Sequence, residues 1–277
     1  MSKLFLKRLI KLFISVFYFV FSGLNRVFRR LFRKFSPANL IIVMYHSVHS
    51  DEKDKFIKHV QFAKKVGIPV FPDIDQPLQP GVRHIALTFD DAFENFYQNA
   101  LPVLRRHNIP ATVFVPTGFI GLKEGWIKNK SSRNFNENLM SATQLAELPT
   151  DIVRIGSHCK SHLPLARLNI EDRKEELEES KQMLEQLLGR EIRLLALPHG
   201  SFTHDTEEIS LKAGYDRVFF AEPIFRSTNF NDVLKGRIDV TLNDWSIEYK
   251  LKYLGAYQWE RYSFKIKNIL KLNQHRN

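Results

Sequence analysis

Short apolar segments of β-strand character alternate with segments of helical periodicity along residues 40–240 of this 277-residue chain. The strand-like segments are residues 40–44, 85–89, 111–115, 153–155, 194–197, 217–221 and 237–240. The helical segments are residues 53–66, 93–107, 141–148, 169–188 and 205–213. Alternating strands and helices are typical of parallel sheets, so this order predicts one α/β domain whose sheet is either open or closed into a barrel.

Two adjacent carboxylates, Asp90 and Asp91, follow the strand predicted at residues 85–89. That strand enters the core, where a charged group is costly unless an opposite charge compensates it. In parallel sheets, active sites lie at the carboxyl ends of the strands, which is where this pair stands. The pair therefore indicates a bound metal ion at that end of the sheet.

Two histidines, His158 and His162, follow the strand predicted at residues 153–155. They can converge on one ion if the segment turns helically, although such a pair alone is more often two surface histidines. Beside the two carboxylates, the pair indicates a metal held by one carboxylate and two imidazoles, with open positions, as in a hydrolytic centre. The second carboxylate is then free to accept a proton from water.

These residues resemble the polysaccharide deacetylases of the carbohydrate esterase 4 class, which share the NodB-homology domain. Thr88–Asp91 is similar to the family's first motif and Ser157–His162 to its second, and the two together are specific. Further similarities lie at residues 44–48, 110–120, 197–202 and 236–240, the first and last of which are found in the branch that acts in cell-surface polysaccharide assembly. The resemblance covers most of the chain and implies a single distorted (β/α) barrel of about seven parallel strands.

Carried over position by position, the resemblance implies that Asp90 is the general base and that Asp91, His158 and His162 bind the metal. The backbone N–H of His199 would donate to the tetrahedral oxyanion. The implied reaction is hydrolysis of an N-acetyl group from an amino sugar by metal-activated water, with acetate released. Zn²⁺ suits the implied ligands, and Co²⁺, Ni²⁺ and Mn²⁺ are the alternatives.

The chain departs from the family pattern at three motifs. Ala196 stands where the third motif has the Arg that steadies the base, and Thr241 stands where the fourth motif has its first Asp, although Asp244–Trp245 is similar to the rest of it. We find no Leu-x-His like the fifth motif, whose histidine protonates the leaving amine. His204 and His46 are the candidate general acids, and each is also explained as an ordinary loop or supporting histidine.

The net charge of +11 belongs to the two ends of the chain. Residues 1–35 carry nine Lys and Arg and no acid, and residues 246–277 carry seven against two acids. The remaining residues, 36–245, are slightly acidic, which argues against a nucleic-acid-binding face, and no nucleic-acid-binding motif is found. Basic, Phe-rich ends instead favour an anionic membrane surface as partner.

An amphipathic helix is predicted in the N-terminal segment, with apolar residues recurring at helical spacing from Leu24 to Phe35 and basic residues opposite. The apolar stretch over residues 12–24 is shorter than the ~20 residues needed to cross a bilayer. We therefore expect a helix lying in the membrane interface. A membrane-spanning signal anchor, and a helix packed on the protein's own core, are the alternatives.

The predicted organisation is a membrane-anchoring helix over residues 1–36, a deacetylase domain over 37–256 and a basic tail over 257–277. The single cysteine, Cys159, excludes an internal disulfide and favours attachment to the cytoplasmic face of a bacterial envelope. The predicted substrate is an N-acetylated glycan or lipid-linked saccharide at that membrane. The alternatives are a catalytically impaired carbohydrate-binding scaffold in a glycan assembly complex and a hydrolase of a non-sugar amide.

Overall fold

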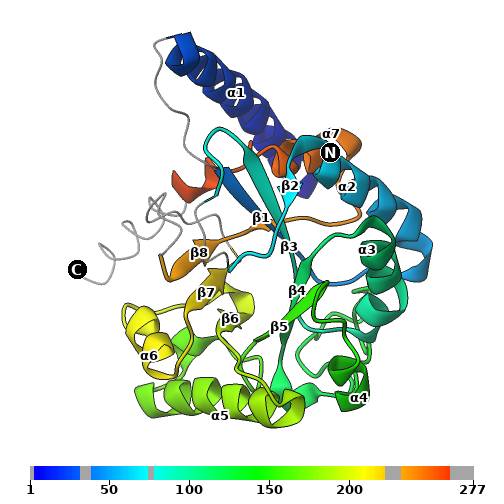
Figure 1. The fold of residues 1–277 in the computed structure, drawn as a ribbon, viewed down its shortest axis with the longest axis vertical. Coiled ribbons are helices and arrows are strands. Elements are labelled where there is room, and N and C mark those ends of the chain that lie inside the picture. Colours follow the sequence, from blue (N-terminus) through cyan, green and yellow to red (C-terminus); the bar gives the residue numbers. More distant parts are fainter. Residues whose placement is uncertain (1–2, 32–38, 74–77, 222–231, 263–277) are drawn as a thin grey trace.

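One parallel sheet organises the computed structural model, which describes residues 3–31, 39–73, 78–221 and 232–262 (Figure 1). In this part of the chain the strand order is β8-β7-β6-β5-β4-β3-β1-β9, and β2 (Ile68–Pro69) pairs with β3 beside that path. The strands on the path are β1 (Asn39–Tyr45), β3 (Arg83–Phe89), β4 (Ala111–Val115), β5 (Val153–Ser157), β6 (Leu194–Ala196), β7 (Arg217–Phe220), β8 (Leu234–Gly236) and β9 (Ile238–Asp239). The predicted α/β barrel of parallel strands is confirmed.

Helices connect the strands and cover the outside of the sheet (Figure 1). They are α2 (Lys53–Val66), α3 (Leu101–His107), α4 (Ala142–Ala146), α5 (Ile170–Leu188), α6 (Thr206–Lys212) and α7 (Ser246–Tyr253). The ends of α5 follow from its sequence, since the side chain of Asn169 accepts the N–H of Asp172 and Gly189 ends the helix with a φ of 64°. The helix predicted at residues 93–107 begins instead with a π-helical turn, Phe96–Ala100, before α3.

Within the last predicted strand, residues 237–240, only Ile238–Asp239 form a strand, β9, and the residues just before Arg237 form a separate strand, β8. β8 pairs with β7 at one edge of the sheet, and β9 pairs with β1 at the other edge. Since Arg237 alone separates β8 from β9, the chain itself bridges the two edges at this residue. The barrel is therefore nearly closed, and the closing residue carries a long cationic side chain.

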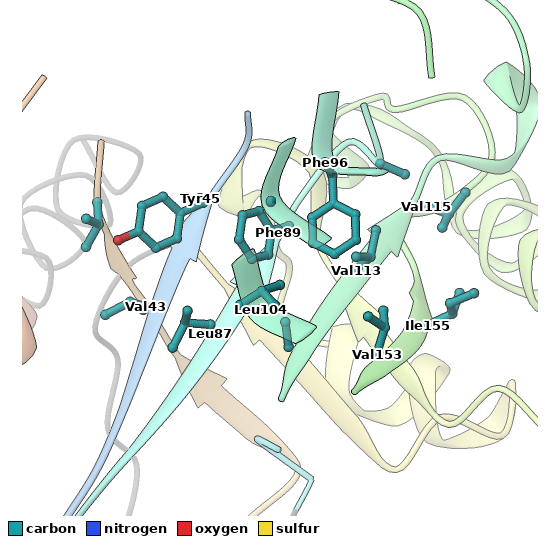
Figure 2. Close-up of a cluster of buried hydrophobic side chains, with 14 of the residues drawn as sticks. Val43, Tyr45, Leu87, Phe89, Phe96, Leu104, Val113, Val115, Val153 and Ile155 are labelled. Atoms are coloured by element: carbon teal, nitrogen blue, oxygen red, sulfur yellow. The ribbon is translucent and has the colours of Figure 1, made fainter. Parts of the chain in front are cut away.

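The core has two layers because successive residues of a strand face opposite sides of the sheet. The larger layer lies between the sheet and the helices and includes Val43, Leu87, Phe89, Phe96 and Val113 (Figure 2). The smaller cluster occupies the enclosed side and consists of Ile42, Ala86, Phe114, Leu194, Ala196 and Phe219. Strands buried on both faces explain why the segments read as nearly continuous apolar runs.

Helix α1 (Lys3–Leu31) is docked on α7 and the segment after it by one face of its first half. Arg8 Nε donates to Glu248 at 2.8 Å, Lys11 pairs with Glu260 at 2.7 Å, and the buried Ser15 accepts a hydrogen bond from Trp259 Nε1 at 2.8 Å. The second half of α1 extends beyond the barrel (Figure 1). The alternative of a helix packed on the protein's own body therefore holds for one face of its first half.

The opposite face of α1 is an apolar stripe that stays exposed. Its members recur at spacings of three and four residues, and they are Leu6, Ile10, Phe13, Phe17, Val20, Phe21 and Leu24. The aromatic rings are among the most exposed apolar groups, at 81% for Phe13 and 75% for Phe17. No helix in the described ranges is both long and apolar enough to cross a membrane. Most of the amphipathic pattern predicted between Leu24 and Phe35 lies outside the described side chains.

Candidate active site

The two carboxylates leave β3 on a strained turn at the carboxyl end of the sheet. Asp90 N donates to Tyr45 O at 2.9 Å, which continues the pairing of β3 with β1 by one residue. Asp91 and Ala92 then adopt left-handed backbone conformations, with φ of 69° and 50°. Such conformations cost about 1–3 kcal/mol each in residues other than glycine and are concentrated at functional sites. The turn directs the two neighbouring carboxylates to different partners.

Asp91, His158 and His162 meet at one point. Their ligand atoms lie within 4.8 Å of one another, and all three side chains are buried. His162 Nε2 lies 3.0 Å from Asp91 Oδ1, and His158 Nε2 lies 3.7 Å from the same oxygen. Among the described residues, this buried oxygen has no hydrogen-bond donor of acceptable geometry. An unpartnered carboxylate oxygen that faces two imidazole nitrogens fits a divalent cation held between them.

Different contacts orient the two imidazoles. His158 Nδ1 lies 2.7 Å from the carbonyl oxygen of Ala196, so that nitrogen carries the proton and donates, and Nε2 presents its lone pair toward Asp91. The indole of Trp126 stacks on His162, with ring centroids 4.0 Å apart and planes 20° apart. Both nitrogens that face the site are thereby directed by groups outside the ligand set.

The protonation states of the site suit cation binding. Burial lowers the pKa of His158 to about 4, although the neighbouring Asp90 and Asp91 oppose that shift. Burial alone would raise the pKa of Asp91, but the close approach of His162 Nε2 and the charges of His46, His162 and His158 bring the pKa to about 2. At neutral pH the imidazole of His158 is therefore neutral and the carboxylate of Asp91 is ionised, as metal ligands must be.

Asp90 is held by Arg237, which the sequence analysis did not identify. Arg237 Nη1 donates to Asp90 Oδ1 at 2.6 Å and Nη2 donates to Oδ2 at 2.7 Å, a bidentate pair. The guanidinium has no exposed surface, and its Nε donates to Phe220 O at 3.2 Å. Burial raises the pKa of Asp90, but the charges of Arg237 and His158 outweigh it and the pKa lies below its ordinary value. Asp90 is thus an ionised carboxylate with a fixed orientation.

The sequence does contain a feature that indicates a buried ion pair at Arg237. An arginine between Gly236 and Ile238, in a segment predicted to be a buried strand, requires an anionic partner for the same reason that Asp90 requires a cation. Arg237, from the segment that closes the barrel, therefore makes the contact with Asp90 that the resemblance assigns to the Arg missing at Ala196. The carbonyl of Ala196, meanwhile, supports His158, which any residue type at that position can do.

Trp126 belongs to a polar, irregular insertion over residues 126–138, between β4 and α4. Glu124 organises its start, because the carboxylate accepts the N–H groups of Trp126 at 3.1 Å and Ile127 at 2.8 Å. The indole also contacts Phe119 edge to face, with centroids 4.9 Å apart. The insertion therefore forms part of the wall of the site beside His162. The sequence did not predict this position for Trp126, because a single aromatic residue in an irregular polar segment shows neither helical nor strand periodicity.

The other predicted site histidines fall at different places. The left-handed turn at His199, with a φ of 57°, brings its ring within 4.8 Å of the ring of His162. His46 follows Tyr45 just as Asp90 follows Phe89, and Tyr45 and Phe89 are register partners of β1 and β3. The charge of His46 also lowers the pKa of both Asp90 and Asp91, whereas the charge of His204 acts on Asp205.

The segment similar to the fourth motif packs against the N-terminal helix. Asp244 accepts a hydrogen bond from Lys252 Nζ at 2.6 Å and another from Thr241 N at 3.2 Å. Trp245 lies edge to face with Phe5, with centroids 5.8 Å apart, and the guanidinium of Arg8 lies 4.3 Å from its ring centroid. The contact with Lys252 joins this loop to α7, the contact with Thr241 lies within the loop, and the two contacts of Trp245 join the loop to α1.

A parallel barrel that gathers one carboxylate and two histidines at its carboxyl end, with a second carboxylate beside them, is the arrangement expected of metal-dependent hydrolases. Residues 78–218, which are more than half of the chain, match the family model described as polysaccharide deacetylase. The chain belongs to the polysaccharide deacetylase family, as its first two motifs predicted.

Two relatives are similar to this chain over more than half of its length. The poly-beta-1,6-N-acetyl-D-glucosamine N-deacetylase of Staphylococcus aureus (strain MSSA476) is 30% identical over 177 residues, 61% of this chain and 58% of that protein. YxkH of Bacillus subtilis (strain 168) is 26% identical over 198 residues, 68% of this chain and 66% of that protein. The chain therefore spans less than two thirds of the length of either relative.

Solved structures share the fold. IcaB from Ammonifex degensii superimposes with a TM-score of 0.64 at 22% identity, covering 80% of this chain and 100% of that one. The Streptococcus pyogenes deacetylase PplD, in complex with acetate, gives 0.58 at 20% identity, covering 76% and 93%. At these identities the superpositions concern the fold alone, and they agree with the predicted barrel.

The ion pair between Arg237 and Asp90 leads to a prediction about stability. Arg237→Met should lower the free energy of unfolding by about 3–5 kcal/mol, because it leaves the Asp90 charge buried and unpaired. Asp90→Leu combined with Arg237→Met should recover much of that loss, since no unpaired charge remains. Urea denaturation of the two variants and the parent, followed by circular dichroism, measures both effects. Equal stability of the parent and Arg237→Met would contradict the pairing.

Proposed function

We propose that this protein is a metal-dependent N-deacetylase that removes acetyl groups from an amino-sugar polymer and releases acetate. The observation that carries the proposal is that the two adjacent carboxylates have different partners. Asp91 faces two imidazole nitrogens, while Asp90 is held in a separate bidentate pair with Arg237. One carboxylate is thus placed to bind a cation, and its neighbour is kept ionised and oriented to accept a proton.

Asp91, His158 and His162 would hold the cation, with zinc as the predicted ion. When bound, such a cation polarises the acetamide carbonyl and makes water more acidic. Asp90 takes the proton of the attacking water at a carboxylate oxygen, and Arg237 keeps that carboxylate facing the site as it does so. The acetamide C–N bond then breaks, which yields acetate and the free amine of the sugar.

The backbone N–H of His199 is the proposed donor to the oxyanion that forms on the acetyl carbon. The left-handed turn at His199 directs this segment, and its ring lies against that of His162. A backbone donor requires a turn of the right shape and no particular side chain, so a histidine can stand at this position.

His46 is the better candidate for the general acid that protonates the leaving amine. It stands at the end of β1, beside the end of β3 that carries Asp90, and its charge is felt by both carboxylates. His204 lies beside Asp205 and acts on that residue. The predicted pair of candidates is therefore reduced to one on grounds of position.

The proposed substrate is a polymer of the poly-β-1,6-N-acetylglucosamine type. The Staphylococcus aureus relative carries that substrate in its name, and it is 30% identical to this chain over 177 residues. Trp126 adds a partly exposed indole next to His162, and aromatic faces are apolar surfaces suited to the C–H face of a sugar ring. The alternative of a catalytically impaired scaffold is weakened. It was suggested in part by the missing Arg at Ala196, and Arg237 supplies a guanidinium that binds Asp90 instead.

Attachment to a membrane surface through α1 is proposed from its exposed apolar stripe. The nine basic residues of residues 1–35 favour anionic lipid, although Arg8 and Lys11 are engaged by Glu248 and Glu260 of the barrel. These two ion pairs tie the helix to the catalytic body rather than to head groups. Attachment at the cytoplasmic face stays a prediction from the single cysteine.

The different roles proposed for Asp90 and Asp91 can be tested directly. Asp90→Asn should bind zinc as the parent does but release acetate about 10²–10⁴ times more slowly, because the proton acceptor is lost. The measurements are acetate release from soluble β-1,6-N-acetylglucosamine oligomers and zinc content by mass spectrometry. Undiminished release by Asp90→Asn would remove the proposed base. A parent protein that releases no acetate from any N-acetylated glycan tested would favour the scaffold.

The assignment of the acid is tested by a matched pair of histidine variants. His46→Gln should lower kcat by about 10²–10⁴, because no group then protonates the leaving amine, and His204→Gln should leave kcat near the parent value. Rates are compared on the same oligomers at saturating zinc. A loss confined to His204→Gln would reverse the assignment.

The apolar stripe of α1 is tested in the chain with α1 kept, because deleting the helix would uncover Trp245 and Trp259. Phe13→Glu combined with Phe17→Glu and Phe21→Glu should abolish sedimentation with vesicles that contain anionic lipid, since it places charge where acyl chains would be contacted. Leu211→Glu, a change at an exposed apolar residue of α6, is the control and should sediment like the parent. Unchanged sedimentation of the triple variant would contradict attachment through this stripe.

A further inference from the structure

The loop that carries both histidine ligands has an unfavourable backbone. Between His158 and His162 the chain turns through Cys159, whose φ is 61°, and His162 itself has a φ of 55°. The loop contains no glycine, although glycine is the residue that adopts such values freely. Its conformation therefore depends on contacts with the surrounding structure.

Glu176 of α5 provides the densest set of those contacts. Its Oε2 accepts the backbone N–H groups of Lys160 and Ser161, each at 2.9 Å, and its Oε1 accepts the hydroxyl of Ser161. The side chain is nearly buried, with 8% of the residue exposed. All three donors belong to the short segment between the two histidines, so this carboxylate clamps the middle of the ligand loop.

The opposite side of the loop rests on the segment after β4. Thr117 N donates to Cys159 O at 3.0 Å, and Gly118 N donates to Lys160 O at 2.9 Å. The approach is close, because a Cβ at Gly118 would lie 2.8 Å from Lys160 O. The loop is thus held between a fixed backbone on one side and the Glu176 carboxylate on the other.

We propose that Glu176 is a positioning residue for the metal site, which pre-organises His158 and His162 without touching the cation. A carboxylate that accepts two consecutive backbone N–H groups stabilises the turn in which both N–H groups point the same way. That turn determines where the imidazole of His162 lies relative to Asp91. The proposal rests on the metal-binding part of the proposed function and is independent of the glycan.

The test is the affinity of Glu176→Gln for zinc, measured by competition with a chromophoric chelator and without any glycan. The amide keeps the size of the side chain but replaces one acceptor oxygen with a donor, so one side of the clamp is repelled. Groups that support metal ligands typically contribute 10–100-fold to metal affinity, and we expect a loss of about that size. Acetate release at saturating zinc should recover toward the parent rate, since the ligands themselves are intact.

The control is Glu179→Gln on the same helix. Glu179 pairs with the ammonium of Lys160 at 2.5 Å, so this change removes the same charge near the same loop without touching its backbone. Its zinc affinity should stay within about twofold of the parent, as expected for an exposed ion pair. An equal loss in Glu179→Gln would show that charge near the loop, and not the clamp, sets the affinity, and would overturn the proposal.

Thermal melting separates positioning from a general effect on folding. A structural role alone would lower the Tm of metal-free and zinc-loaded protein equally, whereas a positioning role reduces the rise in Tm that zinc produces. If Glu176→Gln does not fold, Ser161→Ala decides, because it removes only the hydroxyl donor and should weaken zinc binding by a smaller factor. Parent-like zinc affinity in whichever variant folds overturns the proposal. A parent chain that binds no zinc would instead refute the metal site itself.

Discussion

The bidentate contact between Arg237 and Asp90 is the interaction on which the closed end of the barrel and the candidate site both depend. The guanidinium lies within the barrel, with 5.3 Å between its carbon and the ring centroid of Phe114, and it binds Phe220 O as well as Asp90. Two fully buried charges are tolerable only because each satisfies the other. Arg237, which joins β8 to β9 where the sheet closes, is thus also the residue that keeps Asp90 ionised. Closure of the barrel and the ionisation of Asp90 therefore depend on the same contact.

The metal site depends on backbone geometry more than on the identity of its neighbours. Asp91 and His162 both adopt left-handed conformations, and His158 is oriented by a backbone carbonyl at Ala196. Turns of this kind place two carboxylates that are adjacent in sequence in different environments. A regular strand would also separate two adjacent side chains, but it would not hold both at the same level of the barrel. The energy stored in these turns is offset by the extensive core beneath them.

Most of the fold and the metal triad followed from local patterns, whereas Arg237 and Trp126 did not. Alternation of strands and helices predicted the parallel barrel, and the two carboxylates and two histidines stood out because strand-end carboxylates and paired histidines are unusual. The choice of Asp91 as the metal ligand came from the resemblance to the family. Arg237 stands 147 residues after Asp90, and no local pattern joins them. Trp126 comes from an irregular insertion, where neither strand nor helix periodicity applies. What the sequence could not provide was long-range pairing, since it arises from closure of the sheet.

The departures from the family pattern are better understood as relocations than as losses. β3, β1 and β9 are neighbours in the sheet, so the residues at their ends lie side by side although they are far apart in the chain. Asp90 follows β3 and His46 follows β1, and Arg237 follows β8 and extends its guanidinium to Asp90. Because a barrel presents its strand ends on one rim, a charge that one strand lacks can be supplied by another strand or its connection. The chemistry is therefore constrained by position on the rim, and the order of motifs along the sequence is free to vary.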